Sequence, residues 1–262
     1  MSTECELQLF CPKPKADRCA QAIVKEAKRI EKKYSFYNPS SVLSRINTRE
    51  NQILDQETKN LLQMAKHYYE VTGGLFDVTV ATLKVCYRYK TTKELETCLK
   101  SMLPYVGAHR FKVVKNKIIF DNPYTKIDLG GFAKEYAVDR ALLEVKKMKI
   151  PSAIINFGGD IYIHGKKPDL KEFKIGIKDP RNPQRFIKFL ELSDCAVTTS
   201  AHYERSITIE GRSHSHIISP RGFSKALSTT VIAPSALEAG VYSTALSIEG
   251  CLASPHRVLF IY

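Results

Sequence analysis

The segment that decides the fold reads Lys126-Ile-Asp-Leu-Gly-Gly-Phe-Ala-Lys-Glu-Tyr-Ala-Val-Asp-Arg-Ala141. An apolar strand ends at Asp128, two glycines make a turn, and the helix that follows carries Lys134 in its first turn. Glycines let the backbone approach an anion, and a helix start offers free N–H groups and the positive end of the helix dipole. The segment therefore suits a phosphate group. Gly-Gly is also a common tight connection, however, and Asp128 and Lys134 could simply pair with each other or cap the helix.

Four more polar, glycine-marked segments interrupt the apolar strands and helices. Residues 153–163 read as a buried strand, a bend at two glycines and a second strand. Residues 73–79 lead from a helix C-cap to an aspartate and a threonine. Two further polar stretches cover residues 198–205 and 213–222. Because loops on a rigid scaffold concentrate binding groups, we expect the five segments to form one composite site.

Some of these polar residues also have ordinary structural interpretations. Asp77 could be only the N-cap of a helix over residues 78–89. His202, His214 and His216 invite comparison with a zinc site, but no cysteine or acid lies beside them at ligand spacing. His214 and His216 also alternate along an expected strand, so the sequence disfavours zinc.

Short motifs follow one another in a fixed order from Met1 to about residue 250. They are Met1-Ser-Thr, Ser35-Phe-Tyr-Asn-Pro-Ser-Ser-Val-Leu-Ser-Arg-Ile-Asn47, Gly74-Leu-Phe-Asp-Val-Thr79, Asp128-Leu-Gly-Gly-Phe-Ala-Lys134, Asn156-Phe-Gly-Gly-Asp160, Thr199-Ser200, Ser215-His-Ile-Ile218 and Val231-Ile-Ala-Pro-Ser-Ala-Leu-Glu-Ala239. This order resembles that of the ApbE-type FAD:protein FMN transferases, also called flavin transferases. The resemblance implies an α+β fold with mixed, largely antiparallel sheets and packed helices. It also implies an ApbE-like architecture, related to the T-fold, in a single domain over residues 1–262.

The resemblance implies a reaction as well. Such enzymes bind FAD and Mg²⁺, and a serine or threonine hydroxyl in the flavinylation motif of a partner protein attacks the FAD pyrophosphate. FMN then stays on the partner as a phosphoester and AMP leaves. The chemistry needs positioning and charge neutralisation more than covalent help.

The resemblance also assigns residues to roles. His216 and Lys134 take the catalytic positions, with His216 beside the reacting phosphate. The positions that contact FAD are Met1, Tyr37, Leu75, Phe76, Asp77, Asp128, Lys134 and Ile218. The metal positions are Gly131, through its backbone carbonyl, Gly240, Ser243 and Thr244.

Four positions depart from the family's pattern, and Gly240 matters most. The family has an aspartate there, and hard cations prefer carboxylate oxygens, so we expect weak Mg²⁺ binding. Glu135 and Ala201 each replace a glycine, and Ser219 replaces an aspartate. A non-catalytic FAD-binding homologue is therefore the alternative to a transferase, followed by an interaction module with an empty site. We expect Gly240→Asp, one helical turn before Thr244, to lower the Mg²⁺ requirement and speed transfer with little change in helix stability.

Composition fits an enzyme of this kind without selecting one. The 262 residues, 44% of them apolar, can bury a sizeable core. The 40 basic and 27 acidic residues give a net charge of +13, which suits an anionic dinucleotide or an acidic partner. The charges interleave along expected helices and no nucleic-acid-binding motif occurs, so we expect no nucleic-acid partner.

Cysteine usage and hydropathy bear on the compartment. The seven cysteines are scattered without a Cys-x-x-Cys pair, which argues against a disulfide framework and for a reducing compartment. No charged-then-apolar leader precedes the first strand, and no apolar run approaches about 18 residues. We therefore expect a cytoplasmic protein without a membrane span.

Periodicity predicts the secondary structure. Helices are expected over residues 16–34, 57–71, 93–102, 132–148 and 235–248, with a loop between the first two. Residues 111–120 read as a hairpin, and further strands are expected at 5–10, 153–157, 160–163, 173–177, 186–192, 196–199, 206–210, 215–218, 229–233 and 257–262.

Overall fold

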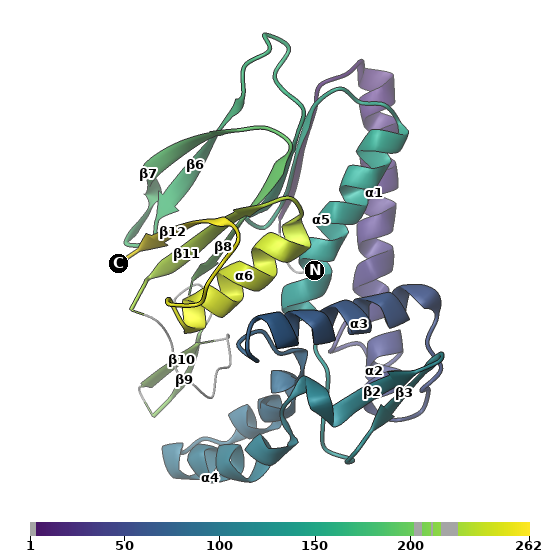
Figure 1. Ribbon diagram of the computed structural model, residues 1–262, viewed down its shortest axis with the longest axis vertical. Coiled ribbons are helices and arrows are strands. Elements are labelled where there is room, and N and C mark those ends of the chain that lie inside the picture. Colours follow the sequence, from purple (N-terminus) through teal and green to yellow (C-terminus); the bar gives the residue numbers. More distant parts are fainter. Residues whose placement is uncertain (1–3, 202–205, 211, 216–224) are drawn as a thin grey trace.

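A six-stranded antiparallel sheet runs through the upper part of the molecule (Figure 1). The computed structural model describes residues 4–201, 206–210, 212–215 and 225–262. In spatial order, the strands are β1 (Cys5–Leu9), β4 (Ala153–Phe157), β5 (Asp160–His164), β8 (Cys195–Ala201), β11 (Ser228–Ala233) and β12 (Arg257–Ile261). Each strand pairs with its neighbours in antiparallel register, so segments far apart in the sequence lie side by side in the sheet.

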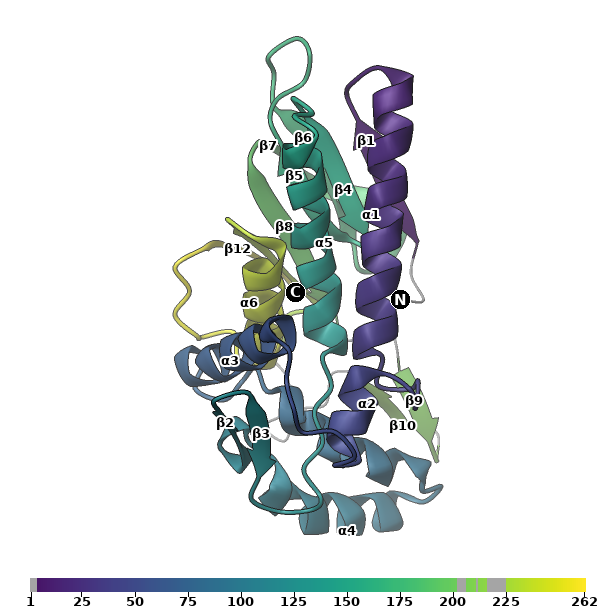
Figure 2. The ribbon, with the colours of Figure 1, turned by 90° about the vertical axis from the view of Figure 1, so that its right-hand side faces the viewer.

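Helices lie on one face of this sheet. They are α1 (Lys13–Tyr34), α5 (Gly130–Lys147) and α6 (Ala236–Ile248), and Figure 2 shows α1 and α5 side by side. Ile155 of β4 and Val231 of β11 are buried on this face together with Val138 of α5 and Leu237 of α6. Removing these apolar side chains from water is what holds the helices on the sheet.

A two-stranded hairpin covers the other face. It consists of β6 (Phe173–Asp179) and β7 (Asn182–Leu192), and its apolar residues share a core with Ile163 of β5 and Val197 of β8. The preceding residue on each of these strands, Tyr162 and Ala196, belongs to the core on the helical face. This alternation has the period of two that a sheet buried on both faces requires.

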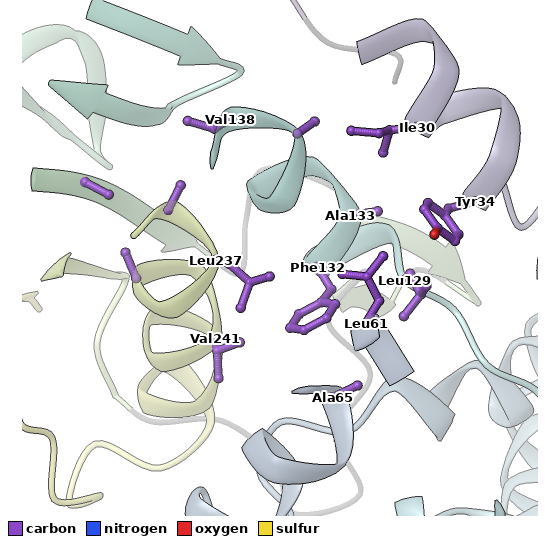
Figure 3. Close-up of a cluster of buried hydrophobic side chains, with 14 of the residues drawn as sticks. Ile30, Tyr34, Leu61, Ala65, Leu129, Phe132, Ala133, Val138, Leu237 and Val241 are labelled. Carbon is purple, nitrogen blue, oxygen red and sulfur yellow. The ribbon is translucent and has the colours of Figure 1, made fainter. Parts of the chain in front are cut away.

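The lower part of the molecule is mostly helical. It contains α2 (Val42–Asn47), α3 (Gln56–Val71), the 3₁₀ helices η1 (Val78–Arg88), η2 (Leu103–Tyr105) and η3 (Ala108–Arg110), α4 (Thr92–Met102), and the hairpin of β2 (Phe111–Val114) and β3 (Lys117–Phe120). Figure 3 shows Leu61 and Ala65 of α3 next to Phe132 of α5 and Val241 of α6. One apolar cluster therefore contains residues of both parts, and the single domain over residues 1–262 stays a prediction.

Side-chain caps fix where several helices begin. Asp55 accepts a hydrogen bond from the Thr58 N–H at the start of α3, and Ser235 accepts one from the Glu238 N–H at the start of α6. Ser41 does the same for α2, a helix that falls in the loop expected after residue 34. Six residues are too few to show helical periodicity, which is why the sequence pattern missed α2.

Most predicted elements are present with shifted ends. The helix expected after Asp77 is a 3₁₀ helix. Strand β9, Ser206–Ile209, pairs with β10, Arg212–Ser215, and the strand expected at residues 215–218 lies outside the described residues after Ser215. Cys86 of η1 and Cys98 of α4 form a disulfide, which the scattered spacing of the cysteines did not predict. Within the described part of the chain, no helix has the length and apolarity needed to cross a bilayer.

Candidate active site

The first helical turn of α5 is open at its two glycines. The Gly130 N–H is held by the Asp128 carboxylate at 2.8 Å, and the Phe132 and Ala133 N–H groups both donate to the Leu129 carbonyl. Gly131 is exposed, and a Cβ added there would meet no atom within 4 Å outside its immediate neighbours. A ligand can therefore approach the backbone closely at this helix start.

The second Gly-Gly turn lies beside the first. Gly158 and Gly159 join β4 to β5 with φ of 60° and 94°, a left-handed conformation that strongly favours glycine. Asp160 follows this turn, is 2% exposed and forms an ion pair with the Lys134 ammonium of α5. The two turns that the sequence marked separately are thus joined by a salt bridge between their own polar residues.

Asp128 pairs with a residue that no motif marked. Its Oδ2 atom forms an ion pair with Lys84 Nζ of η1, which also lies 3.3 Å from the Tyr37 hydroxyl and 4.6 Å from the centroid of the Phe36 ring. Burial alone would lower the pKa of Lys84, but the Asp128 carboxylate and the Tyr37 hydroxyl more than offset it, so the pKa is raised. The simple alternative in which Asp128 pairs with Lys134 is wrong, since each of the two has another partner.

Tyr37 stands at the surface of this cluster. Tyr37 is 81% exposed. Its ring lies edge-on to the Phe36 ring, with 5.4 Å between the two ring centroids. The exposed ring face is available to stack on a planar group. Lys84 has no local sequence signal, because it is one of many lysines on helical segments.

Residues 75–79 adjoin the cluster through a hydrogen bond from the Asp128 N–H to the Val78 carbonyl at 2.9 Å. Asp77 caps η1 by accepting hydrogen bonds from the Thr79 N–H and hydroxyl at 2.8 and 2.6 Å, so the cap interpretation is confirmed. Burial raises the pKa of Asp77 despite these two bonds. Leu75 and Phe76 are buried in the core, with the Phe76 ring 5.5 Å from that of Phe132, which limits contact with a ligand to the small part of each residue left at the surface.

Helices α5 and α6 meet at Glu135 and Gly240. A Cβ added at Gly240 would lie 2.5 Å from Glu135 Cγ and 3.2 Å from its Cδ. The prediction that Gly240→Asp leaves helix stability little changed is therefore wrong, because the aspartate would collide with a buried side chain and place two acids together.

Hydroxyl groups follow one turn later on α6. Ser243 Oγ lies 2.9 Å from Ser200 Oγ of β8 and donates to the Gly240 carbonyl at 3.0 Å. Thr244 Oγ1 lies 3.3 Å from the same Ser200 oxygen. The expected metal positions 240, 243 and 244 thus lie together with the Thr199-Ser200 motif.

The acids near Gly240 bear on whether a hard cation fits. Glu135 is 5% exposed, and no hydrogen-bond donor among the described residues reaches its Oε2 atom. Burial and then the neighbouring Asp160 carboxylate raise the pKa of Glu135 well above its usual range. The described residues contain no group of three histidines, cysteines or acids that could hold a metal, so a cation here would combine a carboxylate with hydroxyl or carbonyl oxygens. Such an all-oxygen set suits Mg²⁺ and not zinc.

Three expected site residues lie outside the described residues: Met1, His216 and Ile218. His202 of the zinc alternative and Ser219 lie there too. The structure brings together Tyr37, Asp128 and the residue 75–79 segment on one side, and Gly131, Lys134, Asp160 and the α6 positions on the other.

Comparisons with known proteins identify the family of the chain. The model of the ApbE family matches residues 1–256. The chain is 27% identical to the FAD:protein FMN transferase of Chlamydia pneumoniae over 74% of its own length, and 25% identical to that of Vibrio cholerae over 84%. It spans 62% of the length of the Chlamydia protein and 70% of the Vibrio protein.

Solved structures show the same fold. The ApbE protein of Thermotoga maritima superposes with a TM-score of 0.85 at 29% identity, covering 97% of this chain and 88% of that one. The flavin transferase ApbE from Vibrio cholerae superposes with a TM-score of 0.83 at 23% identity, covering 99% and 90%. The expected α+β fold with antiparallel sheets and packed helices is confirmed.

Proposed function

Because the chain belongs to the ApbE family, we propose that it is an FAD:protein FMN transferase. The acceptor is a serine or threonine hydroxyl in the flavinylation motif of a partner protein. The hydroxyl oxygen forms a bond to the phosphorus of the FMN half of FAD, and the bond from that phosphorus to the bridging oxygen breaks. AMP leaves with the bridging oxygen, the hydroxyl proton passes to a base, and the flavin undergoes no redox change.

The observation that carries this proposal is the Lys134–Asp160 ion pair, which joins the two Gly-Gly turns. A pyrophosphate beside the exposed Gly131 backbone would lie at a helix start, where the helix dipole favours an anion. Lys134, in the first turn of that helix, would neutralise part of its charge. Asp160 is then a positioning residue that holds the ammonium toward the turn.

The Tyr37 cluster fits the other requirement, recognition of a planar ring. Tyr37 offers an exposed ring, and the Lys84–Asp128 pair behind it fixes the surrounding polar groups. Leu75, Phe76 and Asp77 would form the wall of the same site. Met1 and Ile218 as FAD contacts, and His216 beside the reacting phosphate, rest on the family resemblance alone.

A bound Mg²⁺ would offset charge on the pyrophosphate and on the departing AMP. The Gly131 carbonyl and the hydroxyls of Ser243 and Thr244 are the neutral oxygens that would hold it. Gly240 supplies no side-chain oxygen, so the negative charge at this site would come from another residue or from the FAD pyrophosphate itself, which could hold Mg²⁺ with waters and Thr244.

The test mixes the purified protein with FAD, Mg²⁺ and an acceptor that carries a flavinylation motif, followed by in-gel flavin fluorescence of the acceptor. We expect labelling by the wild type, little by Lys134→Ala, and wild-type labelling by Lys147→Ala, an exposed lysine of the same helix. FAD binding without labelling would favour the alternative, a non-catalytic FAD-binding homologue, for which the missing aspartate at Gly240 is the supporting observation. No FAD binding would leave an interaction module with an empty site.

A further inference from the structure

The two departures at Glu135 and Gly240 occupy the same space. A side chain at position 240 would begin 2.5 Å from Glu135 Cγ and 3.3 Å from its Oε1 atom. The volume next to Gly240 is therefore filled by the Glu135 side chain, which comes from α5. Glycine at 240 leaves room for the glutamate side chain at 135.

The charges around Glu135 do not balance. Glu135 and Asp160 are buried acids, and Lys134 is paired with Asp160 while its Nζ lies 3.9 Å from Glu135 Oε1. If both acids are ionised, two negative charges face one ammonium. Buried carboxylates in this arrangement must either share a proton or bind a further cation.

Further oxygen atoms lie on α6, one turn after the position that borders the Glu135 side chain. Glu135 Oε2 receives no hydrogen bond within the described part of the chain. On α6, the Ser243 and Thr244 hydroxyls follow Gly240 by one turn and meet Ser200. Carboxylate, hydroxyl and carbonyl oxygens are the donor set of Mg²⁺ and Mn²⁺.

We propose that Glu135 is the carboxylate ligand of a Mg²⁺-type divalent cation, supplied from α5 in place of an aspartate on α6. The use of that cation in flavin transfer rests on the proposed function, whereas its binding does not. On this proposal the Glu135 and Gly240 departures form one exchange between two helices, and neither signals a decayed site.

The first experiment measures Mn²⁺ binding to the protein by electron paramagnetic resonance, without FAD and then with saturating FAD. We expect Glu135→Gln, which keeps the side-chain length, to weaken Mn²⁺ binding at least about tenfold, as loss of a charged ligand should. Glu144→Gln on the same helix is the matched control and should bind like the wild type. Mg²⁺ should raise the melting temperature of the wild type and of Glu144→Gln but not of Glu135→Gln.

A second set of variants tests the exchange. Gly240→Asp alone should melt at a lower temperature than the wild type and gain no Mn²⁺ affinity. The double variant Glu135→Gly/Gly240→Asp should recover melting temperature relative to Gly240→Asp and bind Mn²⁺, because it returns one carboxylate to the same space from the opposite helix.

Equal Mn²⁺ affinity of the wild type and Glu135→Gln would overturn the proposal. So would a wild type that binds no Mn²⁺ with or without FAD, since the two acids would then share a proton. FAD binding is measured separately by flavin fluorescence in the presence of EDTA. A wild type that binds Mn²⁺ but not FAD would reject the proposed function and leave the cation site in place.

Discussion

The contact between α5 and α6 lets us predict how Gly240→Ala changes the free energy of unfolding. Alanine normally stabilises an exposed or roomy helix position over glycine by about 0.5–1 kcal/mol. At Gly240 the alanine Cβ would lie 2.5 Å from Glu135 Cγ. Because Cγ lies near the backbone and not at the tip of the side chain, the Glu135 rotamer must change to relieve this contact. Overpacking of this kind costs about 1–3 kcal/mol, so we expect Gly240→Ala to destabilise the wild type by up to about 2 kcal/mol net.

The same substitution should have the opposite sign once Glu135 is shortened. In a Glu135→Ala background the space is open, and Gly240→Ala should then raise the free energy of unfolding by the full helix gain of about 0.5–1 kcal/mol. The predicted coupling between the two positions is therefore about 1–3 kcal/mol, within the range seen for residues in direct contact.

Equilibrium urea denaturation of the four proteins in this cycle measures the coupling. Glu144→Ala serves as a control background on the same helix, in which Gly240→Ala should cost as much as in the wild type. An equal effect of Gly240→Ala in all three backgrounds would refute the reasoning, because the two helices would then not meet at these residues.

Three further predictions concern the ligand and the helix contact. Lys134→Ala should weaken FAD binding by about 1.5–3 kcal/mol through loss of a charge-assisted phosphate contact, whereas Lys147→Ala should not, and fluorescence titration distinguishes the two. FAD should bind more tightly than FMN or riboflavin, because the expected contacts surround a dinucleotide; equal affinities in the same titration would speak against this. Asp139 accepts hydrogen bonds from the Ala236 and Leu237 N–H groups, and burial raises its pKa from 3.8 to about 6. The folded protein therefore holds this proton more tightly than the unfolded chain, and stability is lost as the pH rises from 3.8 through about 6. Asp139→Asn, which does not titrate, should gain stability relative to the wild type between pH 4 and pH 7 in urea denaturation, and a pH-independent difference would contradict the pKa assignment.

The sequence predicted most elements because their patterns are local. The alternation in β4 and β5 and the helical period of α5 are visible within ten to twenty neighbouring residues, as is the cap at Asp77. The six-residue α2 escaped notice because it completes too few turns to show a period.

The pairings within the site could not be predicted in the same way. Asp160 lies in a motif, but nothing in the sequence says that it pairs with Lys134, and nothing marks Lys84 as the partner of Asp128. Both pairs are set by how β5, η1 and α5 pack in three dimensions, and such long-range contacts leave no local pattern.

The sequence marks both Glu135 and Gly240 as departures from the family's pattern, but it does not show that the two residues are in contact. One position gains a carboxylate and the other loses one, which is the pattern of a compensating exchange. Taken alone, the change at position 240 indicates a weakened metal site. The contact between α5 and α6 gives the pair a different meaning, because both changes concern the same volume.

The central claim, that this chain transfers FMN from FAD to a partner protein, is tested most directly by stoichiometry. The acceptor is incubated with the protein, FAD and Mg²⁺, and its mass is measured alongside the AMP released. The account predicts that the acceptor gains the mass of one FMN phosphoester for each AMP formed, and that Lys134→Ala lowers both signals together. An unmodified acceptor in the presence of bound FAD, or AMP release without the mass gain, would contradict it.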